Sequence, residues 1–464
     1  MQSEASVADT AAAPGAEAGT PPRIVEVARG RGHNIVVVGG GAAGLELVTK
    51  LGRRYGQTDR ANVTLIDRAR THLWKPLLHA VAAGSLDTGE EELNYLAHAA
   101  RNHYTFRFGE LVGLDRAAKR VHLGATFDDE GRPITPRRSV PYDTLVIAIG
   151  SITNDFGTPG AAQYAIPLET PEQAVRFNRR VVNACLHAHT QEGPVRPGQL
   201  HMAIIGAGAT GTELAAELHH TVRQIIAAGL DRIVPERDIK IVLIEAAPRI
   251  LPALPERISN ATTELLRKLD VEVRANARVT AVSAEGVTLQ GGDFIPAEIV
   301  VWAAGVKGPE VLTKLDGLEV NRINQLVVQP TLQTTRDEDV FAIGDCAACP
   351  REGFETPVPP RAQAAHQQAD HMARQIDYIL AGKLLSPFKY RDFGSLVSLG
   401  HYSTVGSLMG LVGRAFFIEG TFALLMYRSL HKMHERAIYS TSRMAADTIA
   451  RTLSRRPDRM VKLH

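Results

Sequence analysis

The chain has 464 residues, of which 44% are hydrophobic and 22% are charged, with 40 glycines and a formal net charge of +2 at pH 7. This length predicts two or three domains, and the composition is typical of a soluble α/β protein with many tight turns. The balanced charge argues against nucleic-acid binding, and three cysteines are too few for a disulfide framework. The sequence contains no uninterrupted run of about 18 apolar residues, so we expect no membrane-spanning helix.

Residues 1–32 are rich in Ala, Pro, Gly and Glu and lack the apolar stretch that a signal peptide carries. A segment of this composition cannot bury enough apolar surface to fold alone. We therefore expect a disordered leader and place the start of the fold at His33. The low cysteine content favours a reducing cytosol.

A dinucleotide-binding fingerprint follows the leader. Residues 35–38 form an apolar run typical of a buried strand, and Gly39, Gly41 and Gly44 then give the pattern Gly-x-Gly-x-x-Gly before an amphipathic helix. Such glycines allow a tight turn and let a pyrophosphate approach the positive helix N-terminus. The next predicted strand ends in Asp67, near the separation of about 20 residues at which an acid binds the adenosine ribose.

The same pattern recurs at Gly206, Gly208 and Gly211, after an apolar strand at residues 202–205 and before a second helix. The following strand ends in Glu245, later than the usual separation of about 20 residues. We interpret the extra residues between Gly211 and Glu245 as a longer helix and a longer loop after it. Two dinucleotide sites in one chain indicate two cofactors that exchange electrons.

The choice between NAD and NADP depends on the second acid. Glu245 would repel a 2′-phosphate, which favours NAD. Arg249 lies close in sequence and weakens this preference, because an arginine can accept a 2′-phosphate.

Three further apolar strands, at residues 142–151, 297–306 and 334–345, would close the nucleotide-binding units. With the two fingerprints they resemble the two-dinucleotide-binding-domain flavoproteins. The resemblance implies FAD on the first fingerprint and NADH on the second. It also implies that Asp345 contacts the ribitol-pyrophosphate of FAD.

The implied fold is α/β, with two Rossmann-like domains and the NADH domain inserted into the FAD domain. We expect the FAD domain at residues 33–160 and 313–400, and the NADH domain at residues 161–312. Residues 401–464 would form an amphipathic membrane-anchoring region.

Three further segments narrow the resemblance: THLWKPLLHAVAAGSLD at residues 71–87, VPPRAQAAHQQA at 358–369 and VKLH at 461–464. With the sequence DCAACP they are similar to bacterial type II NADH dehydrogenase, a single-subunit NADH:quinone oxidoreductase that pumps no protons. The resemblance covers residues 33–464. It implies non-covalent FAD, NADH as substrate, ubiquinone or menaquinone as acceptor, and a peripheral place at the cytoplasmic face of the bacterial inner membrane. A homodimer is also compatible with it.

The family assigns cofactor contacts to matching positions. For FAD these are Gly39, Gly41, Ala42, Ala43, Gly44, Asp67, Arg68, Lys75, Leu111, Ala148, Gly150, Gly344, Asp345, Ala362 and Gln363. For NADH they are Gly206, Gly208, Ala209, Thr210, Gly211, Glu213, Glu245, Ala304 and Gly305. The helix after Pro360 would direct its N-terminus at the flavin pyrimidine ring, where negative charge gathers on reduction.

Gln363 and Gln367 lie four residues apart on one face of that helix. With the family resemblance, we expect their amides to face the carbonyl oxygens of a quinone; without it, they would be two surface glutamines. Glu169 resembles the acid proposed in this family as a proton route. An alternative is that it begins a helix capped by Thr170 with Pro171 at its first position.

Cys346 and Cys349 have the Cys-x-x-Cys spacing of redox dithiols. We expect Cys346 instead to pack as a small apolar residue beside Asp345. Two thiols supply only half of a tetrahedral metal site, so a metal is not predicted.

Residues 420–439 place apolar side chains on one helical stripe beside a mainly basic polar face. We expect this stretch to lie in the interface of an anionic membrane. Packing on the domain or a dimer contact is the alternative. Rival functions also stay open: a sulfide:quinone oxidoreductase using Cys185 and Cys346, a non-catalytic NADH-sensing flavoprotein, and a disulfide reductase.

Overall fold

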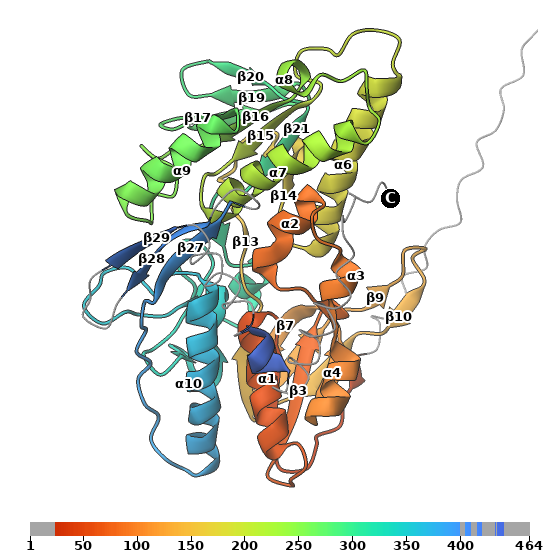
Figure 1. Ribbon diagram of the computed structural model, residues 1–464. Coiled ribbons are helices and arrows are strands. Elements are labelled where there is room, and N and C mark those ends of the chain that lie inside the picture. The colour runs from red at the N-terminus through yellow and green to blue at the C-terminus, as the bar shows by residue number, and fades with distance from the viewer. Residues whose placement is uncertain (1–23, 400–403, 410–414, 420–431, 433, 440–464) are drawn as a thin grey trace, which may run out of the picture.

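The structure, a computed structural model, describes residues 24–399, 404–409, 415–419, 432 and 434–439. It contains two parallel β-sheets, each flanked by helices, stacked one above the other in Figure 1. The predicted α/β class with two dinucleotide-binding domains is confirmed.

The first sheet has the order β24-β25-β12-β2-β3-β6, and its strands are parallel except for the edge pair β24 and β25. Its bounds are β2 His33–Val38, β3 Ala61–Asp67, β6 Thr105–Phe108, β12 Thr144–Ile147, β24 Gln333–Thr334 and β25 Asp337–Ala342. The apolar run of β2 lies at the centre, because a strand covered by helices on both faces is buried throughout. Helices α1 Ala42–Tyr55 and α10 Ala362–Leu380 pack on each other beside this sheet.

The second sheet has the order β14-β21-β15-β16-β17 and is entirely parallel. Its strands are β14 Ala165–Pro167, β15 His201–Ile205, β16 Lys240–Ile244, β17 Val271–Arg274 and β21 Ile299–Trp302. Its main helices are α6 Pro171–Thr190, α7 Ala209–Ala227 and α9 Glu256–Lys268. This sheet is continuous in sequence, whereas the first sheet takes strands from both sides of it, so the second domain is inserted in the first.

Smaller antiparallel elements complete the two domains. Strands β7 Leu111–Asp115, β8 Arg120–Leu123 and β11 Arg138–Pro141 belong to the first, and β18 Val279–Val282, β19 Gly286–Leu289 and β20 Phe294–Pro296 to the second. The C-terminal sheet consists of β27 Gly394–Ser398, β28 Thr404–Met409 and β29 Ala415–Glu419.

The expected leader extends too far along the chain. Residues 1–23 lie outside the described part, but Val25–Glu26 form strand β1, which pairs in parallel with β11. The backbone N–H groups of Val25 and Val27 donate to Arg137 and Ser139 at 2.9 Å. Sequence pattern misses this strand because it is held by backbone hydrogen bonds while its side chains remain exposed.

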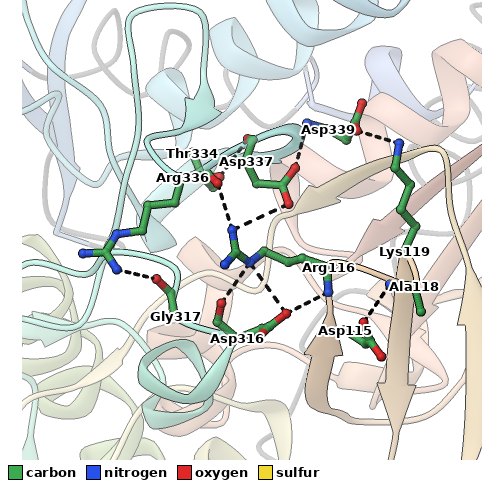
Figure 2. Close-up of polar contacts among 10 residues, drawn as sticks. All are labelled: Asp115, Arg116, Ala118, Lys119, Asp316, Gly317, Thr334, Arg336, Asp337 and Asp339. Carbon is green, nitrogen blue, oxygen red and sulfur yellow. Dashed lines mark hydrogen bonds and ion pairs between the residues drawn. The ribbon is translucent and has the colours of Figure 1, made fainter.

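A polar network joins the two separate chain segments of the first domain (Figure 2). Arg116, in the turn between β7 and β8, donates to the carbonyl oxygens of Asp316 at 2.9 Å and Arg336 at 2.8 Å. Lys119 forms an ion pair with Asp339 at 2.6 Å. The segment before the inserted domain is thereby held to the segment after it.

Among the helices that the structure describes, none has the length and apolarity needed to cross a bilayer.

Candidate functional site

The first glycine turn is built for close backbone approach. Gly39 has φ +103°, and a Cβ there would lie 2.4 Å from the carbonyl oxygen of Ala148. A Cβ at Gly44 would lie 1.9 Å from the carbonyl oxygen of Gly39. A Cβ at Gly41, by contrast, would meet nothing within 4 Å. The turn is therefore tight on its inner side and open where a pyrophosphate would approach the start of α1.

Asp67 braces this turn from the end of β3. Its carboxylate accepts the backbone N–H of Gly40 at 2.5 Å and that of Ala69 at 2.7 Å. Removal from water raises the pKa of Asp67, although these hydrogen bonds oppose the rise. Arg68 is exposed beside it, and Leu111 is buried in the core of the domain.

Asp345 lies near the first turn, although in sequence it follows the inserted domain. Its neighbour Gly344 lies against α1, where an added Cβ would be 3.8 Å from that of Ala43. Ser151 donates from its hydroxyl to Asp345 Oδ2 at 2.9 Å, and Lys75 donates to the carbonyl oxygen of Ser151 at 3.0 Å. Burial raises the pKa of Asp345, while the charge of Lys75 and the Ser151 hydrogen bond oppose the rise.

Ala148 and Gly150 connect β12 to this group, and Gly150 has φ +71°. Sequence reasoning missed Ser151 and also Gln325, whose amide donates to the carbonyl oxygen of Asp345 at 2.8 Å. Neither residue belongs to a motif, so only the folded chain shows that they hold the aspartate.

The second glycine turn repeats the first. Gly206 has φ +102°, and a Cβ at Gly211 would lie 2.0 Å from the carbonyl oxygen of Gly206. Glu245 accepts the backbone N–H of Ala207 at 2.9 Å and that of Ala247 at 2.8 Å. The outer side is open at Gly208, where an added Cβ would meet nothing within 4 Å.

Ala209 and Thr210 are exposed at the start of α7, beside the open turn. The guanidinium of Arg249 is turned to its own loop, where it donates to the carbonyl oxygens of Leu251, Pro252 and Leu254 at 3.4, 3.0 and 2.7 Å. These bonds use both terminal nitrogens of Arg249, so its side chain holds the 251–254 loop. Glu245, and not Arg249, is hydrogen-bonded to the glycine turn.

Each fingerprint helix carries a buried glutamate two residues after its third glycine. In α1 this is Glu46, 3% exposed, which pairs with Lys50 at 2.5 Å and with His366 Nδ1. Burial by itself would raise the pKa of Glu46, but His366 and Lys50 outweigh it and lower the pKa. The repeated spacing was the signal that could have found Glu46 from sequence.

In α7 the matching residue is Glu213, 5% exposed. Its Oε1 accepts the backbone N–H of Ser398 at 2.9 Å, and its Oε2 lies 3.3 Å from Nδ1 of His79. Burial raises the pKa of Glu213 to about 8 and lowers that of His79 to about 4. Both shifts favour the neutral forms of the two groups at pH 7.

The closing strand of the second domain ends beside the junction with the first. After β21, Ala304 is partly buried and Gly305, with φ +67°, lies under the ring of Phe156, whose Cζ would be 2.5 Å from a Cβ there. Strands β13 Ile152–Thr153 and β22 Val306–Lys307 pair antiparallel as the chain crosses between domains.

Gln363 and Gln367 follow Ala362 at the start of α10, and both amides are already hydrogen-bonded. Gln363 donates to the carbonyl oxygen of Gly394 at 2.9 Å and accepts the N–H of Phe393 at 3.0 Å. Gln367 donates to the carbonyl oxygen of Arg391 at 2.8 Å and accepts its N–H at 2.9 Å. The two side chains thus hold residues 391–394 along the helix.

Glu169 accepts the backbone N–H of Thr153 and stands beside the domain crossover. Thr170 caps α6 by accepting the N–H of Gln173 at 3.3 Å, with Pro171 at the first helical position. The predicted capped helix start is confirmed, and it places the Glu169 carboxylate against β13.

The three cysteines are free and buried. Cys346 is 0% exposed, as expected for a packed apolar residue, and burial raises the pKa of Cys346 and of Cys349 to about 12. Cys185 lies in the core of the second domain and Cys346 in that of the first. Among the described residues, no group of three His, Cys, Asp or Glu is arranged to hold a metal ion.

Most of the predicted amphipathic stretch 420–439 lies outside the described residues. Its described end is packed on the first domain: His434 and Ile438 are buried, and the His434 ring stacks on Trp74 with centroids 5.3 Å apart. Arg53 donates to the carbonyl oxygen of Ile438 at 2.8 Å.

Residues 33–369 match the pyridine nucleotide-disulphide oxidoreductase family. The chain is 40% identical over 444 residues to the type II NADH:quinone oxidoreductase of Haemophilus influenzae, covering 93% of this chain and 100% of that protein. It is 30% identical over 416 residues to the type II NADH:quinone oxidoreductase NdhA of Mycobacterium tuberculosis, covering 87% of this chain and 83% of the relative.

Two solved structures share the fold. NDH2 from Plasmodium falciparum in complex with NADH superposes with a TM-score of 0.77 and 18% identity, covering 92% of this chain and 99% of the other. The sulfide:quinone oxidoreductase of Aquifex aeolicus gives a TM-score of 0.68 and 18% identity, covering 92% and 96%.

Proposed function

The chain belongs to the pyridine nucleotide-disulphide oxidoreductases and, among them, to the type II NADH:quinone oxidoreductases, and from this premise we propose how its residues divide the work. The enzyme oxidises NADH with FAD and reduces a quinone without pumping protons. The observation that supports an assignment to residues is the duplicated glycine turn. In one domain Asp67 accepts the N–H of Gly40, and in the other Glu245 accepts the N–H of Ala207.

We assign FAD to the first turn. The open side of Gly41 admits a pyrophosphate, and the ribitol side is formed by Asp345, oriented by Ser151 and faced by Lys75. The bound FAD would supply the redox chemistry, as acceptor of the hydride from NADH and donor of two electrons to the quinone. The protein supplies placement: its glycines allow approach, and Lys75 provides a positive charge beside the aspartate.

We assign NADH to the second turn, with Glu245 at the ribose. An acid there disfavours a 2′-phosphate, and Arg249, bonded to its own loop, does not offset it. Glu213 lies in the first turns of α7, the helix that follows this glycine turn. Ala304 and Gly305, at the domain junction, are the proposed boundary of the nicotinamide site. NADH is therefore preferred over NADPH.

On the quinone side we propose Gln363 and Gln367. Their amides hold residues 391–394, so they would shape the quinone site through this segment, and a quinone oxygen that bonds directly to Gln363 must compete with Gly394. Glu169, which precedes α6 and accepts the N–H of Thr153 on β13, is proposed to hold a proton for quinone reduction. Replacing Glu169 by Gln should then change the pH dependence of quinone turnover; an unchanged profile removes Glu169 from the reaction.

The finer localisation is also a proposal. We place the enzyme peripherally at the cytoplasmic face of the bacterial inner membrane, with ubiquinone or menaquinone as acceptor. It would bind anionic lipid through the C-terminal stretch other than residues 434–439, which pack on the first domain. Deleting residues 440–464 should weaken binding to anionic vesicles while the NADH-driven bleaching of the flavin persists. A homodimer, the remaining partner prediction, would be seen as a doubled mass in detergent.

The deciding experiment is an anaerobic NADH titration of the yellow protein followed by addition of a quinone. We expect NADH to bleach the flavin and quinone to restore its colour. Sulfide should leave the colour unchanged, because Cys185 and Cys346 lie buried in different domain cores. Bleaching by sulfide would favour a sulfide:quinone oxidoreductase, and bleaching by NADH without quinone turnover would favour a sensor.

A further inference from the structure

The hydrophobic core of the NADH domain is completed by two segments that lie outside residues 161–312. One is helix α2 Leu78–Ala83, whose Leu78, Val81 and Ala82 are buried in that core. The other is the end of β27, where Val397 and Leu399 are buried in the same core. Figure 1 shows α2 packed on α6 and α7 of the inserted domain. Both segments therefore cross from the FAD side of the chain into the NADH domain.

Both crossing segments bring a polar atom to the same carboxyl group. His79 of α2 places Nδ1 at 3.3 Å from Glu213 Oε2, and Ser398 of β27 donates its N–H to Glu213 Oε1 at 2.9 Å. Glu213 belongs to α7, the helix that starts at the second glycine turn. One buried side chain of the NADH domain thus contacts each of the two segments that hold the domains together.

The other ends of these segments lie on the FAD domain. Four residues before His79, Lys75 contacts Ser151, which in turn holds Asp345. At the start of β27, the carbonyl oxygen of Gly394 accepts the amide of Gln363 on α10. Each segment therefore runs from Glu213 to a residue that we assign to the FAD or quinone side.

We propose that the His79–Glu213–Ser398 contact is an interdomain lock, and that His79 is a positioning residue for the transfer of hydride from NADH to FAD. The lock fixes α7, and with it the bound nucleotide, relative to the FAD domain, and it fixes β27 beside Gln363. Hydride transfer depends steeply on alignment, since a misplacement of about 1 Å can cost about 100-fold in rate. This inference rests on the proposed function.

The groups that form the lock are buried, and burial favours their neutral forms. The titratable side chains that face Glu213 are His79 from α2 and Glu217 from α7, and β27 presents the N–H of Ser398. Burial is the main cause of the raised pKa of Glu213, and Glu217 adds to it. Ionisation above about pH 8 would place a negative charge beside a neutral imidazole, so the His79 side of the lock should weaken there, while the N–H of Ser398 keeps its acceptor.

The test is the rate at which NADH bleaches the FAD-loaded enzyme in stopped flow, for His79→Phe, His79→Gln and a matched control. Phe keeps the bulk of the ring and loses the polar contact, whereas Gln keeps a polar group that can reach Glu213. The control is His98→Phe, because His98 is as buried as His79, at 4% exposed, but contacts Tyr104 and Ile438 within the FAD half. We expect His79→Phe to slow bleaching by about 10-fold or more, His79→Gln to restore most of the rate, and His98→Phe to leave it near wild type.

Three outcomes would overturn the lock: wild-type bleaching in His79→Phe, no rescue in His79→Gln, or an equal loss in His98→Phe. A wild-type enzyme that NADH does not bleach would instead overturn the proposed function. If His79→Phe fails to retain FAD, the pH profile decides. The wild-type bleaching rate should fall above about pH 8, and this fall should be absent in Glu213→Gln; a fall of the same size in both proteins would contradict the proposal.

Discussion

Helices α1 and α7 begin from the same glycine turn and carry a buried glutamate at the same position, yet their surroundings differ. Glu46 meets Lys50 from its own helix and His366 from α10, both in the FAD half. Glu213 meets His79 and the N–H of Ser398, which reach it from outside the NADH domain. The shared spacing of glycines and glutamate thus fixes the turn, while the elements packed against each helix shift the pKa of its glutamate in opposite directions.

The largest effects should come from breaking one turn at a time. Gly44→Ala places a Cβ against the carbonyl oxygen of Gly39, and Gly211→Ala does the same to Gly206. We expect the first variant to be purified colourless, and the second to be yellow but resistant to bleaching by NADH. The control is Gly193→Ala, where an added Cβ meets nothing within 4 Å. A yellow Gly44→Ala enzyme with full activity would show that the two turns are not divided in this way.

The two glutamates should respond differently to neutralisation. Glu46→Gln removes the buried carboxylate that pairs with His366 and Lys50, although Lys50 keeps its pairing with Asp370. This variant should destabilise the FAD-loaded enzyme by about 2 kcal/mol at pH 7. Glu213→Gln resembles the protonated acid but avoids the cost of protonating it on folding at pH 7, so it should stabilise the enzyme rather than destabilise it. Thermal unfolding followed by flavin fluorescence measures both. A larger loss for Glu213→Gln than for Glu46→Gln would mean that Glu213 is ionised.

The pH dependence of stability sharpens this contrast. Because the pKa of Glu213 is raised from 4.5 to about 8, the unfolded chain loses a proton over this range that the folded protein keeps, and stability falls as pH rises. His79, lowered from 6.5 to about 4, acts in the opposite direction below pH 6.5. Between pH 6.5 and 8, wild type should therefore lose up to about 1.4 kcal/mol per pH unit relative to Glu213→Gln.

The matched measurement uses Glu46→Gln over the same window. The pKa of Glu46 is lowered, so the stability that its charge provides is lost only in acid, as pH falls below 4.5. The ionisation of Glu46 itself should therefore add no slope between pH 6.5 and 8. Parallel slopes for the two variants would remove the distinction between the helices.

The smallest effect concerns how each domain is assembled. The FAD domain is built from two chain segments joined by the Arg116 network in Figure 2, whereas the sheet of the NADH domain is continuous in sequence. Arg116→Ala should lower the stability of the FAD domain by about 1 kcal/mol and leave the affinity for NADH unchanged. Arg132→Ala, which removes an exposed ion pair with Asp128, should have no measurable effect. Equal losses would mean that the network contributes no more than a surface pair.

The sequence was sufficient for features set by neighbouring residues. The apolar runs of β2 and β15, the glycines after them and the acids Asp67 and Glu245 predict the two nucleotide-binding turns, because strand, turn and helix are each dictated locally. The capped start of α6 at Thr170 was predictable for the same reason. Strand β1 was missed, since its backbone pairing leaves no pattern in exposed side chains.

The roles of single side chains depended on partners far along the chain. Gln363 and Gln367 share a helix face as predicted. Their amides bond to residues 391–394, which follow the end of α10 and carry no sequence motif that would predict the contact. His79 and Ser398 reach Glu213 only because α2 and β27 bury apolar side chains in the NADH core. Sequence by itself predicted two dinucleotide-binding turns, each with an acid at the end of the next strand. Tertiary packing decided the surroundings of the buried glutamates, and burial and distant partners together set the free energy of ionisation.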